Sequence, residues 1–558
     1  MTTENRGSRR LRDVARRFAS DTRGNIAMIS AFVIPVLLLI TFGGIDIHRA
    51  STVKANLQDA LDAATLAAAR SQYTADTDIT RVGLASLRAN LAPYNDITLL
   101  TAQTTFVLDP STGAVVGDAR VNVAALVANI ILPMVGQGTG DQIPVGAHSE
   151  VLRSNNRVEV ALVLDNTGSM SGAKLTNTKA AAIDLINRLE AADSRSIEPD
   201  AIKISLVPFS QTVRISQGGS NTVPSYMSNA TTHTGGGQYS TVPTSLFSAA
   251  VGRFTLFGNV GTTWGGCVEA RLAPFDIRDT APLSSTQGRM FVPYFAPDQP
   301  DEGDYPIDWT WRNYAYEDND YLDDARKGLI VPFVDTAARE TEWGLRLRDR
   351  TRYRTSSKRS GTLDTNWGPN RGCDLQPLIR LTDKYGALRT AVDNMIASGN
   401  TNVPLGTMWG WHTLSPNAPF GDGRAYGTER LTKIIIIMTD GENVMSDASN
   451  PNRGTYNGLG YIYQDRLGIT SGSNSQRRTA MDNRFDHPTA GVEDMCGNMK
   501  DQNIEVYTVA VQVDGSAQTL LRRCATDDDH YFPVDSAAGI GAAFDRIAGA
   551  IENLRISR

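Results

Sequence analysis

The chain has 558 residues, which is too long for one ordinary hydrophobic core, so we expect roughly two to four folded units. Hydrophobic residues make up 41% of the sequence and charged residues 20%, which is typical of a folded protein. The net charge of -6 argues against nucleic acid as the main partner. The sequence lacks the motifs H-E-x-x-H, G-x-x-x-x-G-K-[ST] and G-x-S-x-G, which excludes zincins, common P-loop proteins and nucleophile-elbow hydrolases.

A long uncharged stretch lies near the N-terminus. Residues 25–45 carry no charge, and as an α-helix they would span roughly 30 Å, the thickness of a bilayer's hydrocarbon core. We therefore expect a transmembrane helix over residues 25–47 and a basic cytoplasmic tail over residues 1–24, because arginines stay on the cytoplasmic side. A buried core helix and a cleaved signal peptide are the alternatives. The arginines that set this orientation are Arg6, Arg9, Arg10, Arg12, Arg16, Arg17 and Arg23.

Residues 48–152 predict a pilin-like helix and a small membrane-proximal α+β module. Residues 47–71 are alanine-rich and contain neither Gly nor Pro, so we expect the membrane helix to continue outward. Two interpretations of this segment stay open: an amphipathic stalk packed on its own domain, or a helix that packs against partner helices. Two strands around a Pro-Ser-Thr-Gly turn and one further strand follow. Nothing in the module suggests catalysis.

Strands alternate with helices over residues 156–558. The first strand of this region is apolar almost throughout, as expected when helices cover both faces of a sheet. The alternation predicts an α/β fold with a doubly wound, mostly parallel, Rossmann-like sheet. Residues 213–375 interrupt the pattern. They are rich in Gly, Ser, Thr, Asp and aromatic residues. Because a disordered linker rarely carries so many aromatic residues, we expect an ordered insertion.

The four cysteines form no C-x-x-C pair, which argues against zinc ribbons and thioredoxin-like sites. An even number of cysteines in an exported chain favours two disulfides. Cys267 and Cys373 bracket most of the insertion, whereas Cys496 and Cys524 flank a predicted strand. We therefore expect these two pairs, and two buried free thiols are the alternative for Cys496 and Cys524.

A carboxylate and two hydroxyls follow the first apolar strand of the α/β region. Asp165, Thr167 and Ser169 are each two residues apart, so a tight loop can direct their oxygens to one point. Such hard oxygen donors suit Mg²⁺ or Mn²⁺ rather than zinc. Because Mg²⁺ takes about six oxygens, we expect further donors from other loops: Thr401, before a helical stretch, and Asp440, after a second central strand. The alternative is a helix N-cap with turn chemistry.

These three pieces resemble the metal-ion-dependent adhesion site (MIDAS) of von Willebrand factor A domains. D-x-T-G-S after one strand, a threonine in GNTNVPLG and MTDGEN after another strand match that family in order and position. The resemblance implies that Thr167, Ser169 and Thr401 contact Mg²⁺, Mn²⁺ or Ca²⁺, with Asp165 and Asp440 as anionic supports. It also implies an open coordination position for a carboxylate of a protein partner. Thr167 stands where the family most often has serine, and the hydroxyl is retained.

The N-terminal segment resembles a second family. Residues 16–73 are similar to the TadE/TadG-like membrane segment of TadG proteins from the tight-adherence (Flp) pilus system, and the last strand and helix are similar as well. The resemblance implies a single-pass protein of the bacterial inner membrane with a cytoplasmic N-terminus and a periplasmic or extracellular C-terminal region. One residue departs from the pattern: related pseudopilins carry Glu five residues after the cleavage-site glycine, and counting from Gly24 that position is Ile29.

Together these features predict a membrane-anchored binding protein rather than an enzyme. We expect it to assemble or anchor pili by metal-dependent capture of an acidic residue of a protein partner, another component of the Flp/Tad system. One alternative is a surface adhesin that binds host or matrix directly. A remote alternative is a Mg²⁺-dependent phosphatase of the haloacid dehalogenase type, but that chemistry needs a second carboxylate where this chain has Thr167.

Overall fold

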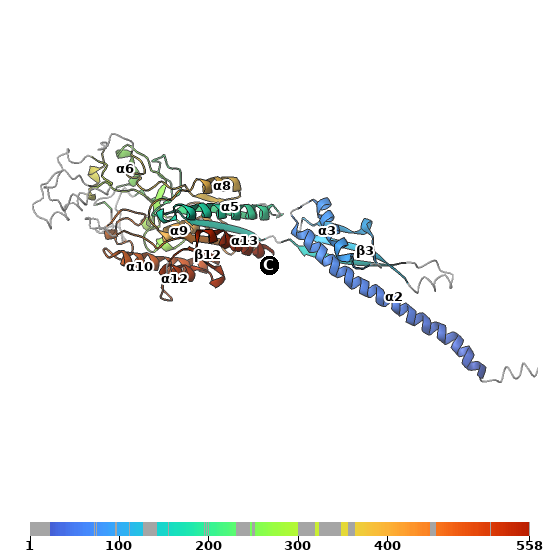
Figure 1. The fold of residues 1–558 in the computed structure, drawn as a ribbon. Helices are drawn as coiled ribbons and strands as arrows, with labels where there is room; N and C mark the ends of the chain where they lie inside the picture. The colour runs from blue at the N-terminus through green and yellow to red at the C-terminus, as the bar shows by residue number, and fades with distance from the viewer. Residues whose placement is uncertain are drawn as a thin grey trace, which may run out of the picture. The chain divides into compact units, whose positions relative to one another are not determined.

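The structure of the chain is a computed structural model (Figure 1). The chain divides into two compact units, Met1–Ser154 and Asn155–Arg558. The predicted cytoplasmic tail lies almost entirely outside the described residues. The structure describes residues 23–71, 73, 75–94, 97–110, 112–125, 142–153, 156–194, 196, 198, 200–229, 246–247, 251–299, 319–322, 347–354, 363–446, 454–513 and 515–556.

A long helix and an antiparallel sheet form the first unit. Its helices are α2 (Arg23–Arg70) and α3 (Asp76–Leu91). Its strands are β1 (Ile97–Leu99), β2 (Thr105–Leu108), β3 (Ala114–Ala124) and β4 (Gln142–Leu152). Strand β3 pairs antiparallel with the other three described strands, so it is the centre of the sheet. The hairpin of β2 and β3 surrounds the predicted Pro-Ser-Thr-Gly turn.

The C-terminal half of α2 packs on this sheet. Leu57, Leu61 and Ala64 recur every three or four residues and are fully buried, which is the spacing of one helix face. Gly117 on β3 has no side chain, and a Cβ atom there would lie 2.4 Å from the hydroxyl oxygen of Thr65. The helix therefore lies directly on the strand, as the interpretation of a stalk packed on its own domain predicts.

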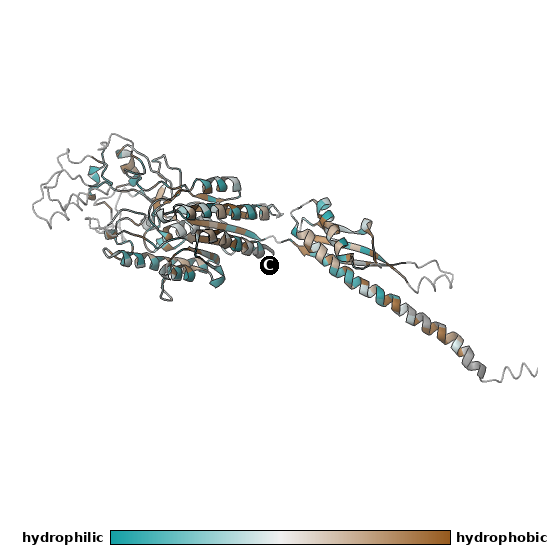
Figure 2. Ribbon diagram, viewed as in Figure 1, coloured by the Kyte–Doolittle hydropathy of each residue, from teal (hydrophilic) through white to brown (hydrophobic). Residues whose placement is uncertain are grey.

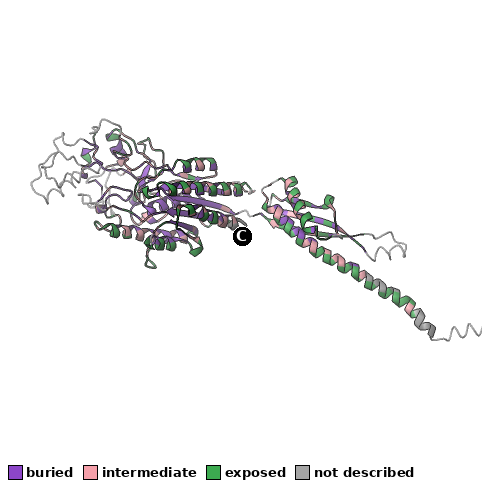
Figure 3. Ribbon diagram, viewed as in Figure 1, coloured by how far each residue is buried: buried purple, intermediate pink, exposed green. Residues whose placement is uncertain are grey.

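Many described residues in the N-terminal half of α2 are both hydrophobic (Figure 2) and exposed (Figure 3). The predicted transmembrane span, residues 25–47, lies inside α2, although the side chains of several of its residues are outside the described set. Over the part of the chain that the structure describes, no helix is long and apolar enough to cross a bilayer, so the transmembrane helix stays a prediction. The large apolar side chains exposed on this half are Ile29, Phe32, Val33, Ile34, Val36, Leu37, Ile40, Ile45 and Ile47.

A sheet of nine described strands forms the centre of the second unit. The strands are β5 (Arg157–Asp165), β6 (Ile202–Phe209), β7 (Val213–Arg214), β8 (Cys267–Glu269), β9 (Val292–Pro293), β10 (Ile379–Thr382), β11 (Leu431–Thr439), β12 (Ile504–Val511) and β13 (Tyr531–Val534). The strands β13, β12, β11, β5 and β6 lie in that order and pair in parallel, as predicted for a doubly wound sheet.

Antiparallel strands of the insertion, together with β10 directly after it, make the sheet mixed. Strands β7 and β10 pair antiparallel with β6, and β8 and β9 continue outward from β7 as antiparallel strands. The physical reason is connection length, because the tight turn between β6 and β7 permits only antiparallel pairing. The insertion, which begins at β7, therefore extends the sheet beside β6 and contributes residues to its core.

Helices cover both faces of this sheet, as a doubly wound fold requires (Figure 1). They include α5 (Ala173–Asp193), α6 (Arg253–Asn259), α8 (Tyr385–Asp393), α9 (Val403–Leu414), α10 (Asn474–Phe485), α11 (Met495–Asp501), α12 (Gly515–Cys524) and α13 (Ile540–Ile556). Along β5, Val160 and Leu162 face one core whereas Ala161 and Val163 face the other, since successive side chains alternate. Helices α5, α8 and α13 close the first core, and α9, α11 and α12 close the second.

Helix α9 is buried along its whole length and packs closely on the sheet. Two glycines one turn apart permit this approach. A Cβ atom at Gly406 would lie 2.4 Å from the ring of Phe209, and one at Gly410 would lie 2.3 Å from Cγ2 of Val163. Residues 396–402 lead into α9, so its close packing fixes where this loop leaves the edge of the sheet.

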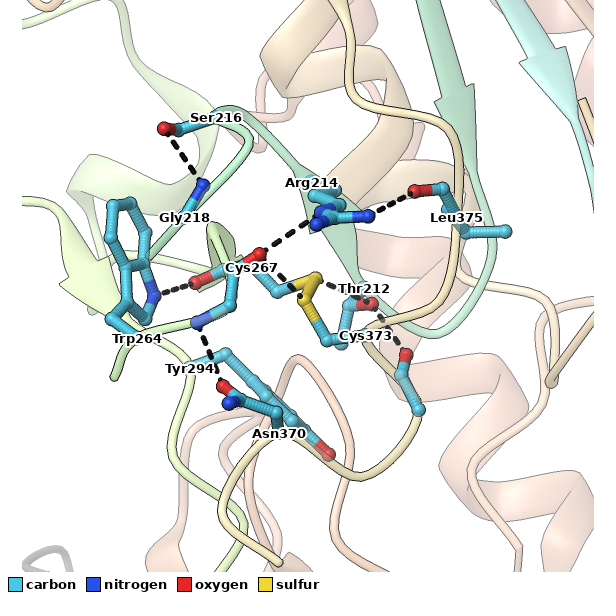
Figure 4. The surroundings of a disulfide bond; sticks show 12 residues. Thr212, Arg214, Ser216, Gly218, Trp264, Cys267, Tyr294, Asn370, Cys373 and Leu375 are labelled. Atoms are coloured by element: carbon cyan, nitrogen blue, oxygen red, sulfur yellow. Dashed lines mark hydrogen bonds between the residues drawn. A yellow bond between two sulfur atoms is a disulfide. The ribbon is translucent and has the colours of Figure 1, made fainter. Parts of the chain in front are cut away.

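Both predicted disulfides are present, namely Cys267–Cys373 and Cys496–Cys524. Figure 4 shows the surroundings of the first, which joins residues 106 positions apart. The hydroxyl of Thr212 donates to the carbonyl of Gly372 at 3.1 Å, and the guanidinium of Arg214 donates to the carbonyl of Leu375 at 3.3 Å. These hydrogen bonds hold the end of the insertion against its beginning at β7, and the disulfide joins the same end to β8.

Gly410→Ala should destabilise the second unit by about 1–3 kcal/mol, because the added methyl group overpacks the contact between α9 and β5. Urea unfolding of the full-length protein measures the change. Gly386→Ala, in the exposed first turn of α8, is the matched control, since no atom lies within 4 Å of a Cβ there. The control should be as stable as the wild type or slightly more stable. Equal stability of the two variants would contradict the packing described here.

Replacing Cys267 and Cys373 together by serine should lower the free energy of unfolding by about 4–5 kcal/mol. The same change at Cys496 and Cys524, which are 28 positions apart, should lower it by about 3–4 kcal/mol, because a shorter loop constrains the unfolded chain less. Guanidinium unfolding followed by tryptophan fluorescence tests both values. Midpoints that match the wild type for both double variants would count against the two bonds.

Candidate metal-binding site

Two neighbouring parallel strands end at the same edge of the sheet and provide the first part of the site. Strands β5 and β11 pair in parallel with Leu164 beside Met438, so the residues that follow them are neighbours. Asp165 ends β5, and Asp440 directly follows β11. In open α/β sheets, ligands bind outside the carboxyl ends of the strands, which is where these two carboxylates lie.

A chain of hydrogen bonds joins the two strand ends. The hydroxyl of Ser169 donates to Oδ1 of Asp440 at 2.6 Å, and Oγ1 of Thr167 lies 2.8 Å from Oγ of Ser169. Deeper in the cluster, the hydroxyl of Thr439 donates to Oδ2 of Asp165 at 2.5 Å. The backbone N–H of Thr167 donates to Oδ1 of Asp165 at 2.8 Å. The D-x-T-x-S loop and the end of β11 therefore form one polar cluster.

The loop over residues 396–402 brings the third predicted piece to the same edge. The N–H of Gly168 donates to the carbonyl of Gly399 at 3.0 Å, which attaches this loop to the one after β5. The N–H of Val444 donates to the carbonyl of Thr401 at 2.9 Å, which attaches it to the loop after β11. Thr401 is therefore held by backbone hydrogen bonds on both sides of its loop.

The Thr401 hydroxyl points to the cluster. Gly441 lies beside it, and a Cβ atom at Gly441 would lie 3.4 Å from Oγ1 of Thr401 and 3.8 Å from Oγ of Ser169. Thr401 is only 4% exposed, and its hydroxyl makes no hydrogen bond to the described residues. A hydroxyl oxygen without a partner in the protein is free to act as a ligand of a cation. The structure thus brings together all five predicted residues.

Burial controls the electrostatics of the cluster. Asp165 is fully buried, and burial raises the pKa of its carboxyl from the ordinary 3.8 to about 6. Hydrogen bonds from Thr439 and Thr167 oppose this shift, whereas the nearby carboxylate of Asp440 adds to it. Ser169 is exposed, so the cluster opens to solvent on that side. The site therefore holds two carboxylates that a cation would stabilise and one side that a ligand can reach.

Two further residues of the cluster were not predicted from the sequence. Nζ of Lys174, in the first turn of α5, lies 2.5 Å from Oδ2 of Asp440. Thr439, the last residue of β11, binds Asp165 through its hydroxyl. The sequence shows both residues close to the motifs, since the lysine follows the first aspartate by nine residues and the threonine directly precedes the second. Their contacts could not be predicted, because these depend on how α5 and β11 are placed.

The donors in the cluster fit a hard divalent cation. Among the described residues, no group of three or more His, Cys, Asp and Glu side chains could hold a metal ion. This cluster has two carboxylates, and its remaining oxygens are the hydroxyls of Thr167, Ser169 and Thr401. Oxygen donors without nitrogen or sulfur suit Mg²⁺ or Mn²⁺, which also retain water in part of their coordination shell.

Comparison with known proteins gives one family match. Residues 24–71 match the family model described as "Putative Flp pilus-assembly TadE/G-like", a segment that covers most of α2. No curated protein matches the chain.

Solved structures with distant similarity include proteins of pili and of a mussel thread. The pilus adhesin SpaC from Lactobacillus rhamnosus GG is 11% identical (TM-score 0.29), over 82% of this chain and 34% of that chain. The vWF domain of the type V pili tip protein Mfa5 from Porphyromonas gingivalis is 12% identical (TM-score 0.29), over 72% of this chain and 97% of that chain. Proximal thread matrix protein 1 from the mussel byssus, with a zinc-occupied MIDAS motif, is 8% identical (TM-score 0.26), over 72% of this chain and 47% of that chain. The chain thus spans about a third of the SpaC chain.

Above pH 6, the metal-free Asp165→Asn variant should be more stable than the wild type. At lower pH, the difference in the free energy of unfolding between the two proteins should be smaller. A raised carboxyl pKa stabilises the fold fully below the unfolded value of 3.8, and this contribution is lost as the pH rises through about 6. The difference at pH 8 should be about 3 kcal/mol at most. Unfolding of both proteins in chelator between pH 4 and pH 8 measures it. The same pH dependence in both proteins would contradict the raised pKa.

Proposed function

We propose that this chain is a membrane-anchored envelope protein of the Flp/Tad pilus system, which assembles or anchors pili through metal-dependent protein–protein binding. The binding region is the α/β unit, with the organisation of a von Willebrand factor A domain. The observation that carries the proposal is the 2.6 Å hydrogen bond from Ser169 to Asp440, which joins two motifs 271 residues apart. It supports a single site built from separate loops rather than a local helix cap.

In this proposal Thr167, Ser169 and Thr401 contact the cation through their hydroxyls, and Asp165 and Asp440 balance its charge. Mg²⁺ is the expected ion, and Mn²⁺ or Ca²⁺ are substitutes with the same preference for oxygen. The metal supplies a positive charge and an open coordination position for an acidic residue of the partner. The exposed side of the cluster at Ser169 is where that residue would enter.

The pilus and membrane parts of the proposal rest on the first unit. The match to the TadE/G-like family model over residues 24–71 supports a role in pilus assembly. Exposed apolar side chains along the N-terminal half of α2, such as Phe32 and Ile40, support burial of this half in a bilayer. Arginines before the helix favour a cytoplasmic N-terminus. Two disulfides in the second unit fit an oxidising compartment outside the cytoplasm.

Thr401→Ala should release the protein partner in the same way as a chelator does. The Thr401 hydroxyl makes no hydrogen bond within the described part of the chain, so its loss should weaken metal binding and leave the fold intact. The measurement is a pull-down with the tagged full-length chain from detergent-solubilised envelopes, with Mg²⁺ or with EDTA, followed by mass spectrometry. We expect pilus components to be captured at least about tenfold less with EDTA or with the variant.

Thr390→Ala is the matched control, because Thr390 is an exposed threonine in α8. Its hydroxyl donates a hydrogen bond to the carbonyl of Gly386 in the same helix. It should capture the same proteins as the wild type. Partners that stay bound in EDTA and to Thr401→Ala would refute the metal mechanism. Captured proteins that do not belong to a pilus system would refute the proposed role.

A further inference from the structure

Lys174 places a fixed positive charge inside the candidate site. Its Nζ lies 2.5 Å from Oδ2 of Asp440, whose side chain is fully buried, whereas the lysine side chain remains 24% exposed. Oδ1 of the same carboxylate accepts a hydrogen bond from the hydroxyl of Ser169. Both oxygens of Asp440 therefore have partners within the protein, and one of these partners is a cation.

Helix stability does not explain a lysine at this position. Lys174 is the second residue of α5, and the first turn of this helix contains no acidic residue. A cation near a helix N-terminus is unfavourable because the helix dipole is positive there. The contact with Asp440 offsets this cost, so the position of Lys174 is explained by the site and not by the helix.

The charge count shows what the lysine changes. With Asp165 and Asp440 ionised, Lys174 leaves the cluster with one net negative charge instead of two. A divalent cation would then give the site one net positive charge. Without Lys174, the same cation would make the site neutral. The lysine therefore weakens the attraction for a metal ion and strengthens the attraction of the metal-loaded site for an anion.

We propose that Lys174 is a tethered cation that tunes this site, lowering its affinity for divalent metal and giving the metal-loaded site a net positive charge that selects a carboxylate. This inference rests on the proposed function, since it takes the five-residue cluster as the metal site. It assigns to Lys174 a role in specificity that goes beyond holding the ion.

Metal binding tests the first part with Mn²⁺ alone as the probe. Electron paramagnetic resonance counts free Mn²⁺ in titrations of the full-length protein. Lys174→Met, which keeps the length of the side chain and removes the charge, should bind Mn²⁺ about tenfold more tightly than the wild type. Lys174→Arg should resemble the wild type. Lys179→Met is the matched control on the same helix, because Lys179 contacts the carbonyl of Asp393 and not the site.

The outcomes separate this inference from the proposed function. Tighter binding by Lys174→Met alone supports it, even if the wild type binds Mn²⁺ too weakly to measure. Binding by the wild type and equal or weaker binding by Lys174→Met overturns the role of Lys174 and leaves the metal site standing. No Mn²⁺ binding by any variant overturns both. Thermal unfolding of each variant verifies that it is folded.

Carboxylate binding tests the second part with acetate as the probe. Acetate that replaces a water on the bound Mn²⁺ lowers the proton relaxation rate of the solvent. At saturating Mn²⁺, the wild type should respond to acetate at a concentration several-fold lower than Lys174→Met does. Lys174→Arg should respond as the wild type does. The same acetate dependence in the wild type and Lys174→Met would overturn the selection of an anion.

Discussion

The candidate site depends on one constraint, namely that two adjacent parallel strands must end at the same edge of a sheet. The register of β5 and β11 sets Leu164 beside Met438, and the hydrogen bond from Ser169 to Asp440 follows from this placement. A shift of this register would move one carboxylate away from the other. The apolar strands that fix the register are buried on both faces, so hydrophobic packing far from the site determines the position of its oxygens.

The third loop reaches the same edge by a different route. Helix α9 approaches the sheet closely because two of its residues, Gly406 and Gly410, have no side chain. The loop before it then lies against the loops after β5 and β11, where backbone hydrogen bonds hold Thr401. Oxygen atoms from three segments far apart in the sequence thus lie close together. Two of these segments provide buried carboxylates, whose negative charge favours the binding of a cation.

Much of this arrangement could be predicted from the sequence. The alternation of apolar strands and helices predicts the parallel core, and the two-residue spacing of Asp165, Thr167 and Ser169 predicts their convergence. Strands of two or three residues in the insertion could not be predicted, because such short segments in a Gly- and Ser-rich sequence have no measurable period. Lys174 was missed for another reason: a lysine in a first helical turn is ordinarily a solvated surface residue, and only the placement of α5 sets it on Asp440.

The central claim is that one hard cation binds where the three loops meet. The most direct measurement is the anomalous scattering of Mn²⁺ in crystals of the protein grown with that ion. The account predicts one strong peak within about 2–3 Å of the hydroxyl oxygens of Thr167, Ser169 and Thr401. Crystals with saturating Mn²⁺ and no peak at these hydroxyls, or with the peak at another part of the chain, would contradict it.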